Sequence, residues 1–363
     1  MMIFDDWRSW TLSKNDALLI AGPCSAENPD QLSTVAEHLQ KLGVSIMRAG
    51  VWKPRTRPNS FEGKGIEALK WLQELKQRIP IKVATEVASP QHAEAAIKYG
   101  MDVLWIGART TVNPFLVQEI ANTLKGIDVP ILVKNPINPE LALWQGAIER
   151  IYNTGNKKVA AIHRGFSSYQ KSKFRNTPSW QIALELKSTF PSLPLICDPS
   201  HIAGNRHMIF EISQKALDLG YDGLMIETHP NPDEALSDAD QQVSLQGLSD
   251  TLDQLRFAQR HSSDALFISQ LEQLREKIDQ IDQELVEILS MRKQLIEKIG
   301  DYKKENNVTV FQLERWNEIL NSRTDWGQSK NLSAKFIQEI YRAIHDESIR
   351  IQTEIMRKET EKK

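Results

Sequence analysis

Ionisable and metal-binding side chains recur through the first 230 residues, each at the end of a short apolar run or just after it. Taken in order, they are Cys24, Arg48, Glu86, Arg109, Lys134, His163 with Arg164, Asp198 with His201, and Glu227 with His229. One such residue alone is usually a surface or ion-pair residue. A series that follows every apolar run indicates a shared site at which the runs end.

The cations of this series would crowd one cleft. They are Arg48, Lys53, Arg55, Arg109, Lys134 and Arg164. Such crowding is costly unless an anionic ligand fills the cleft. The planar arginine fork suits phosphate and carboxylate, and each phosphate group brings about −1.5 to −2 charges near pH 7. The pattern predicts two small phosphorylated substrates.

A second subset combines a thiol, an imidazole and two carboxylates. Its members are Cys24, His201, Glu227 and Asp238. This mixed sulfur, nitrogen and oxygen set is compatible with divalent Mn, Fe, Co or Zn. The alternatives are a buried inert thiol at Cys24 and a solvated carboxylate at Asp238, in the loop LSDADQQ. Cys197 has no assigned task.

Eight apolar runs position these groups. They are Leu18–Ala21, Ser45–Ala49, Lys82–Glu86, Val103–Ile106, Ile131–Lys134, Val159–His163, Leu195–Asp198 and Gly223–Glu227. Continuous Val/Ile/Leu runs are typical of parallel strands buried on both faces. Helical patterns separate them, and eight βα units in about 250 residues predict a TIM (β/α)8 barrel. A doubly wound open sheet is the alternative, but no G-x-G-x-x-G follows the first strand.

Composition excludes several classes of protein. The 363 residues carry 45 Lys plus Arg and 47 Asp plus Glu, a net charge of −2, which gives no bulk attraction to nucleic acid or membranes. Two cysteines exclude a disulfide scaffold and fit a reducing compartment. No apolar run approaches the roughly 18 residues of a membrane helix. We therefore expect a cytoplasmic globular protein of two parts.

The chain divides into a barrel at 1–257, a polar linker at 258–265 and a helical domain at 266–363, an all-α unit with no proline. Its first helix carries apolar residues at alternating spacings of three and four, typical of a seam packed on other helices. These are Leu271, Leu274, Ile278, Ile281, Leu285, Ile288, Leu295, Ile299 and Tyr302. A helix near Leu313–Asn321, a loop at Asp325–Lys330 and a last helix at Leu332–Arg357 follow.

The motifs AGPCSAE, KPRT, GAR, HRG and DPSH, with the spacing from Glu227 to Asp238, resemble 3-deoxy-D-arabino-heptulosonate 7-phosphate (DAHP) synthase of the barrel-only subtype. The family condenses phosphoenolpyruvate with erythrose 4-phosphate at the start of the shikimate pathway. The resemblance implies that Cys24, His201, Glu227 and Asp238 hold a divalent metal, with Mn2+ preferred and Fe2+, Co2+ or Zn2+ as alternatives. It implies that Arg48, Lys53, Arg109, Lys134 and Arg164 hold phosphoenolpyruvate, and that Arg55 and Thr56 hold erythrose 4-phosphate.

The nearest alternative is 3-deoxy-D-manno-octulosonate 8-phosphate synthase, which shares the barrel but lacks the KPRT segment. The chain departs from the DAHP synthase pattern at Arg57, where a small Ser is common, and at Asn135-Pro136. We expect Glu86 to assist the attacking water and Lys53 to supply a proton. An ion pair with Arg109 or Lys134 is the alternative role for Glu86.

Polar residues interrupt the apolar faces of the tail. Arg292 lies on the seam, and Lys303 lies 11 residues further on, nearly on the same face. Arg275 precedes Arg292 by 17 residues, roughly 25 Å along a helix, so it would reach the same ligand only from an antiparallel copy in a dimer. Ser348 and Gln352 lie one turn apart on the last helix.

These residues resemble the all-helical chorismate mutases. The resemblance implies that Arg292, Arg315, Ser348 and a second subunit's Arg275 bind the carboxylates of chorismate, while Lys303 and Gln352 contact its ether oxygen. Many such mutases have E-R-E, in which the second Glu binds the substrate hydroxyl, but this chain has Trp316 there. Gln312 or Glu318 are the candidate replacements. The alternative is a tail that only dimerises or regulates.

A bifunctional synthase and mutase is therefore expected. Only 17 residues precede the first apolar run, so feedback control is expected to act through loops or the helical domain, with chorismate or prephenate bound at the tail inhibiting the barrel. A non-enzymatic alternative is an anion-binding barrel with a dimerisation arm.

Overall fold

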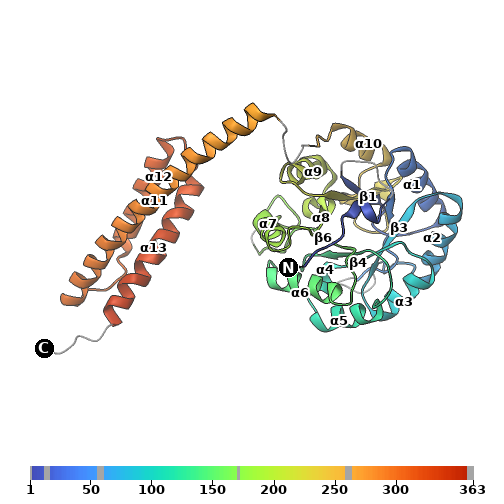
Figure 1. Ribbon diagram of the computed structural model, residues 1–363, viewed down its shortest axis with the longest axis horizontal. Helices are drawn as coiled ribbons and strands as arrows, with labels where there is room; N and C mark the ends of the chain where they lie inside the picture. The colour runs from blue at the N-terminus through green and yellow to red at the C-terminus, as the bar shows by residue number, and fades with distance from the viewer. Residues whose placement is uncertain (1, 12–16, 55–60, 170–171, 258–263, 358–363) are drawn as a thin grey trace. The chain divides into compact units, whose positions relative to one another are not determined.

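The computed structural model describes residues 2–11, 17–54, 61–169, 172–257 and 264–357 (Figure 1). The chain forms two compact units, one ending at Arg260 and one beginning at His261.

The first unit is a closed barrel of eight parallel strands in sequence order, with β8 paired to β1. The strands are β1 Leu18–Gly22, β2 Ile46–Arg48, β3 Lys82–Val87, β4 Val103–Ile106, β5 Ile131–Lys134, β6 Val159–His163, β7 Leu195–Cys197 and β8 Gly223–Glu227. The predicted TIM barrel is confirmed, and the doubly wound open sheet is wrong because the first and last strands hydrogen-bond to each other.

Helices follow the strands around the barrel (Figure 1). They are α1 Pro29–Lys41, α2 Ile66–Arg78, α3 Pro90–Lys98, α4 Ala108–Thr111, α5 Pro114–Thr123, α6 Leu141–Tyr152, α7 Trp180–Thr189, α8 Pro199–Ala203, α9 Ile209–Asp218 and α10 Leu245–Gln254. Short 3-10 turns lie at Trp7–Ser9, Arg206–Met208, Pro232–Glu234 and Ala239–Gln241. Asn28, Ser89 and Asn113 each precede a first-turn proline and accept a backbone N–H, which fixes where α1, α3 and α5 begin.

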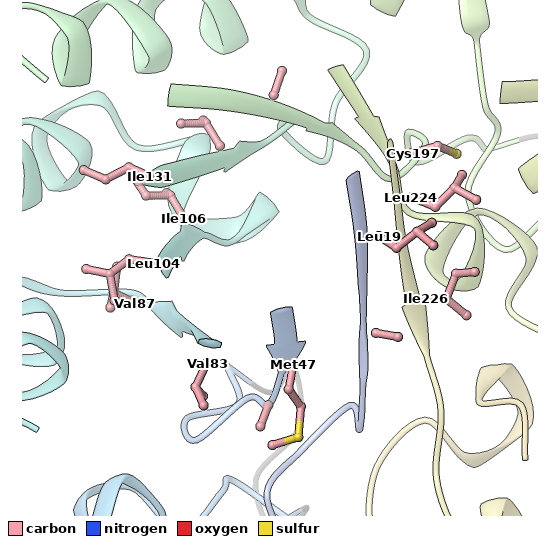
Figure 2. Close-up of a cluster of buried hydrophobic side chains, with 14 of the residues drawn as sticks. Leu19, Met47, Val83, Val87, Leu104, Ile106, Ile131, Cys197, Leu224 and Ile226 are labelled. Atoms are coloured by element: carbon pink, nitrogen blue, oxygen red, sulfur yellow. The ribbon is translucent and has the colours of Figure 1, made fainter. Parts of the chain in front are cut away.

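Successive strand side chains alternate between two buried layers. The outer layer packs against the helices and includes Leu19, Val83, Leu104 and Ile226 (Figure 2). The inner layer fills the barrel and is closed by two tryptophans from the N-terminal segment; it consists of Trp7, Trp10, Leu18, Ile20, Ile46, Ala84, Val103, Trp105, Leu132, Ala160, Ile162, Ile196 and Met225. Because side chains alternate with period two, the residue two after an inner residue also points inward.

This alternation selects which strand-end groups face the barrel interior. Arg48, Glu86, Lys134 and Glu227 each stand two residues after an inner-layer residue. His163 instead follows the inner residue Ile162 directly, so its ring points outward, where it contacts Tyr221 and the carbonyl of Pro178. The expectation that every strand-end group shares one site is therefore wrong for His163.

The second unit contains α11 Ala265–Glu305, α12 Leu313–Gln328 and α13 Ala334–Arg357. The loop predicted at Asp325–Lys330 is wrong for its first four residues, because α12 continues to Gln328. Gly327 allows this, since a Cβ there would lie 2.3 Å from Cγ1 of Ile337 on α13. Within the described residues, no helix is long and apolar enough to cross a membrane.

Candidate active site

A cavity of about 240 Å³ opens among the loops that follow the barrel strands. It is lined by Lys53, Pro54, Glu86, Gly107, Ala108, Arg109, Lys134, Ile137, Arg164, Arg175, Asn176, His201 and Asp238. Seven of the residues predicted from sequence are in this lining. The lining carries an excess of cationic groups, as an anion-binding site requires.

Arg48 and Glu227 form a buried ion pair beside the cavity. Nη2 of Arg48 lies 2.9 Å from Oε1 of Glu227, and both side chains are almost wholly buried. The Arg48 Nε and Nη1 atoms are buried and have no hydrogen-bond partner among the described residues. Gly22, with φ at 145°, permits this placement, because a Cβ there would meet the Arg48 carbonyl at 2.1 Å. Arg48 therefore retains unused donors.

The DPSH segment organises a second set of charges. Asp198 caps α8 by accepting the His201 backbone N–H through Oδ1. Its Oδ2 lies 2.8 Å from Nζ of Lys134 and 2.8 Å from Nδ1 of His201. Burial alone would raise the pKa of Asp198, but His201 and Lys134 outweigh it and hold that pKa well below its usual range. Asp198 thus stays ionised and holds Lys134 and the His201 backbone by hydrogen bonds.

Cys24 follows β1 and contacts a residue from the far end of the barrel sequence. Its Sγ lies 3.3 Å from Oδ2 of Asp238 and 2.9 Å from Nζ of Lys53. Burial and the Glu227 carboxylate raise the pKa of the thiol to about 12. Asp238 has a left-handed backbone, with φ at 46°, which an Asp tolerates better than most residues.

The four predicted metal ligands form two neighbouring pairs. Cys24 contacts Asp238, and Nδ1 of His201 lies 3.8 Å from Oε1 of Glu227. Glu227 acts on the pKa of Cys24, and His201 on that of Asp238, so the pairs are close enough to interact. Across the part of the chain that the structure describes, no three His, Cys, Asp or Glu side chains already surround one metal-sized point.

The donor types nevertheless fit a divalent metal. One thiol, one imidazole and two carboxylates come from the segments that follow β1, β7 and β8, with Glu227 at the end of β8 and Asp238 in the loop after it. Neighbouring cations outweigh the opposing effect of burial and hold the pKa values of Glu227 and Asp238 below the usual range. Arg48 and Lys53 contact the Glu227 and Cys24 groups. The positive charges of Arg48 and Lys53 thus face two of the four proposed ligands.

Glu86 accepts a hydrogen bond from the Trp105 indole N–H at 3.0 Å. Gly107 packs against it, since a Cβ there would lie 2.0 Å from Oε1 of Glu86. Lys134 forms an ion pair with Asp198, so the ion pair between Glu86 and Lys134 that was the alternative role for Glu86 is not observed.

Nη1 of Arg164 donates to Oδ1 of Asn176 at 2.7 Å. Burial lowers the pKa of Arg164 to about 10.

Sequence reasoning missed several residues of this site. Arg175 reaches Asp238 at 3.1 Å, and Asn176 bridges Arg164 and the His201 carbonyl. Gln241 donates to Oε2 of Glu227 at 2.6 Å, and Gln242 accepts the Cys24 N–H at 3.0 Å. The two glutamines lie in the quoted LSDADQQ loop, so their closeness to Asp238 was an available signal. Arg175 and Asn176 follow no strand directly and offered none.

The structure describes only the first two residues of the KPRT motif, Lys53 and Pro54. Arg55 and Thr56, the predicted contacts to erythrose 4-phosphate, lie outside the described residues, as does Arg57.

The helical unit brings together part of its predicted site. Nη1 of Arg292 on α11 donates to Oγ of Ser348 on α13 at 2.8 Å, and Gln352 donates to the Ser348 carbonyl. Oε1 of Gln352 is buried without a hydrogen-bond partner in the described chain. Lys303 donates to the Val310 carbonyl at 2.6 Å.

Two predicted cations of the helical unit lie elsewhere. Arg315 pairs with Glu318 at 2.6 Å on an exposed face of α12, and Arg275 is exposed near the start of α11. The helical seam is exposed as well: Ile281 is 62% and Leu295 60% accessible. One chain therefore presents only part of the predicted chorismate site.

Two family profiles match this chain. Residues 11–260 match the DAHP synthetase I family, and residues 274–353 match chorismate mutase type II. A phospho-2-dehydro-3-deoxyheptonate aldolase of Thermotoga maritima is 32% identical over 66% of this chain and 68% of its own length. A 2-dehydro-3-deoxyphosphooctonate aldolase of Geobacter sulfurreducens is 27% identical over 66% of this chain and 91% of its own length.

Solved structures give the same result. The crystal structure of the Thermotoga maritima DAHP synthase has a TM-score of 0.59 and 30% identity, over 65% of this chain and 67% of that one. A truncated form from the same organism has a TM-score of 0.58 and 27% identity, over 67% and 89%. The chain belongs to the DAHP synthetase I family and carries a C-terminal chorismate mutase type II domain.

Proposed function

We propose that the barrel condenses phosphoenolpyruvate with erythrose 4-phosphate to DAHP, and that the helical domain converts chorismate to prephenate. The observation that supports the synthase activity is the cationic cavity at the barrel mouth, together with the buried N–H donors of Arg48 behind its wall, which lack a partner among the described residues. Unpaired buried donors are costly, so they favour an anionic ligand.

The Arg and Lys residues around the cavity would bind and orient phosphoenolpyruvate. Arg48, Lys53, Arg109, Lys134 and Arg164 supply the positive charge, and Arg55 with Thr56 would hold the aldose phosphate. Orienting two anions side by side lowers the entropic part of the barrier and offsets their mutual repulsion. Carbon 3 of phosphoenolpyruvate then attacks the aldehyde, water adds at carbon 2, and the resulting phosphohemiketal loses phosphate.

Lys53 and Glu86 are the proposed proton-transfer groups. Lys53 lies at the cavity wall; burial would lower its pKa, but the neighbouring Cys24 and Glu227 side chains outweigh burial and raise it, which keeps a proton available. Glu86 lines the same cavity and is oriented by the Trp105 N–H, which suits a base that positions water. If the Glu86→Ala enzyme turned over at the wild-type rate, Glu86 would have no part in the reaction.

Members of this family are generally metal-dependent. We propose that Cys24, His201, Glu227 and Asp238 hold the ion, with Mn2+ preferred and Fe2+, Co2+ or Zn2+ as alternatives. When bound, such an ion supplies Lewis-acid polarisation of the aldehyde oxygen. Because the Cys24 thiol is protonated near neutral pH, metal loading should release a proton, which calorimetry in buffers of different ionisation enthalpy measures.

The test compares the two cysteines. Cys24→Ala and His201→Ala should abolish metal-dependent phosphate release from the two substrates, whereas Cys197→Ala, an outer-layer change, should leave it within about twofold. Full activity in Cys24→Ala would refute the metal assignment. Turnover with a five-carbon aldose phosphate but not with erythrose 4-phosphate would identify an octulosonate phosphate synthase instead.

For the second activity we propose a homodimer formed through the helical domain, in which Arg275 of the partner subunit joins Arg292, Arg315 and Ser348 around the chorismate carboxylates. Lys303 and Gln352 would stabilise the ether oxygen as negative charge develops there. The contact between Arg292 and Ser348 supports this site. In the free chain the Nε2 donor of Gln352 is bonded to the Ser348 carbonyl, and on substrate binding it would donate to the ether oxygen instead. The exposed α11 seam supports the dimer, because large exposed apolar surfaces mark interaction sites.

Chorismate disappearance tests the second activity. The full-length chain should consume chorismate and Arg292→Ala should not. Absence of consumption by the wild type would leave the tail a dimerising or regulatory module.

We also propose feedback inhibition and a cytoplasmic location. Chorismate or prephenate bound to the helical domain would inhibit the barrel, since both activities share one chain and one pathway. Unchanged synthase rates at saturating prephenate would contradict this. Two free cysteines, Cys24 and Cys197, fit a reducing compartment.

A further inference from the structure

The resemblance to the all-helical chorismate mutases implies that Trp316 stands where a carboxylate would bind the hydroxyl of chorismate, and an indole has no acceptor for that hydroxyl. The structure gives neither of the expected replacements a free carboxylate or amide at the site. Glu318 is exposed and paired with Arg315, and Gln312 is an exposed residue that immediately precedes α12.

His345 of α13 lies directly against Trp316. The two rings stack with their centroids 4.0 Å apart and their planes at 19°. Phe311 contacts the same imidazole edge-on, with centroids 6.0 Å apart. Two aromatic rings from the start of the α12 segment thus fix the orientation of one histidine.

One ring nitrogen of His345 makes no hydrogen bond within the described residues. This nitrogen, Nε2, is buried and has no hydrogen-bond partner in any part of the chain that the structure describes. His345 precedes Ser348 by three residues and Gln352 by seven, so the three lie on one face of α13. The buried Oε1 of Gln352 is unpaired in the same described residues. Two unsatisfied polar atoms on one helix face indicate a polar ligand.

The surrounding charges place His345 beside the proposed substrate cations. Burial lowers the pKa of His345; Asp346 opposes this, while Arg292 and Lys303 lower the pKa further. The imidazole is therefore neutral near pH 7, and its Nε2 accepts a hydrogen bond when Nδ1 carries the proton.

We propose that His345 is the residue that recognises the ring hydroxyl of chorismate in this domain, with Nε2 accepting its hydrogen bond and Trp316 holding the imidazole in place. The proposal rests on the mutase activity proposed above. It replaces a carboxylate contact from α12 with an imidazole contact from α13, and it makes Trp316 a positioning residue.

The experiment uses the full-length chain and two substrates, chorismate and an analogue whose ring hydroxyl is methylated, so that it cannot donate. In the wild type, kcat/KM should be about 10- to 100-fold higher for chorismate than for the analogue. His345→Leu should lose about the same factor on chorismate and bring the ratio of the two substrates close to one. A histidine that only packs would lower both substrates alike and leave the ratio unchanged.

Two further variants complete the test. Trp316→Glu combined with His345→Leu restores a carboxylate acceptor and should recover the preference for chorismate, which also controls for misfolding of the single variant. Glu347→Leu, an exposed polar-to-leucine change on the same helix, should stay within about twofold of wild type. Wild-type preference that survives in His345→Leu would overturn the proposal alone. A wild type that consumes no chorismate would overturn the mutase proposal and this one together.

Discussion

The barrel and the helical unit differ in how far they bury their apolar and charged residues. In the barrel, Arg48 and Glu227 are paired at 1% and 0% exposure inside two complete hydrophobic layers. In the helical unit, the apolar seam of α11 is exposed, and its Tyr302 is 67% accessible. Of the residues predicted to bind chorismate together with Arg292, Ser348 is the one that Arg292 contacts by a hydrogen bond within the described residues. The barrel is complete within one chain, whereas the helical unit presents an unfinished surface.

The difference follows from how each fold positions polar groups. A closed sheet has no unpaired edge, so eight strand ends converge without help from another chain. A three-helix unit has too few elements to surround a ligand and bury its apolar face together. We expect substitutions in the barrel to act within one chain, and substitutions on the α11 seam to act through dimerisation.

The largest expected effect is the loss of Arg48. Arg48→Met leaves the Glu227 carboxylate buried without its partner, which should cost about 3–5 kcal/mol of unfolding free energy in the barrel and abolish synthase activity. Urea denaturation and phosphate release measure the two effects. Mutase activity of the same preparation is the internal control and should stay within about twofold. Retained synthase activity would contradict the role of the buried pair.

A charged side chain on the α11 seam should disrupt dimerisation and mutase activity of the helical unit and leave the barrel unchanged. Ile281→Asp changes a side chain that is 62% exposed in one chain, where a monomer would tolerate it within about 0.5 kcal/mol. In the proposed dimer the charge is buried, so we expect about a 100-fold loss of mutase activity and a monomeric mass. Light scattering measures the mass. Unchanged mass and mutase activity would show that the seam is not an interface.

Acid should act selectively on the barrel through His163. Burial lowers the pKa of His163 to about 4, so between pH 6.5 and 4 the unfolded chain binds a proton that the folded barrel does not. Stability contributed by the neutral ring is therefore present above pH 6.5 and lost as the pH falls toward 4, by on the order of 3 kcal/mol.

The variant His163→Phe should be less stable at pH 7, because the contacts to Tyr221 and Pro178 are lost, but its unfolding free energy should fall less steeply with acid. Urea titrations at pH 7, 6 and 5 measure the slope. Equal slopes in the two proteins would exclude His163 as the titrating group.

Much of the barrel could be predicted from sequence, because parallel strands that are buried on both faces consist of continuous apolar runs. Val103–Ile106, Ile131–Lys134 and Gly223–Glu227 have the predicted bounds. His163 could not be placed, since a shift of one residue reverses the face of a strand and the runs carry no polar face to set the phase. Arg175, Asn176 and the stack of His345 on Trp316 depend on contacts between distant segments, which no local pattern records.

The most direct test of whether the mutase site is shared between two chains is to mix two variants that are each expected to lack mutase activity. Arg275→Ala and Arg292→Ala chains are unfolded together, refolded and assayed for chorismate loss. If each site takes Arg275 of the partner subunit, half of the dimers regain one intact site, and about a quarter of wild-type activity should return. Synthase activity should stay constant throughout. No recovery, in a mixture shown by differential tagging to contain mixed dimers, would contradict a site shared between two chains.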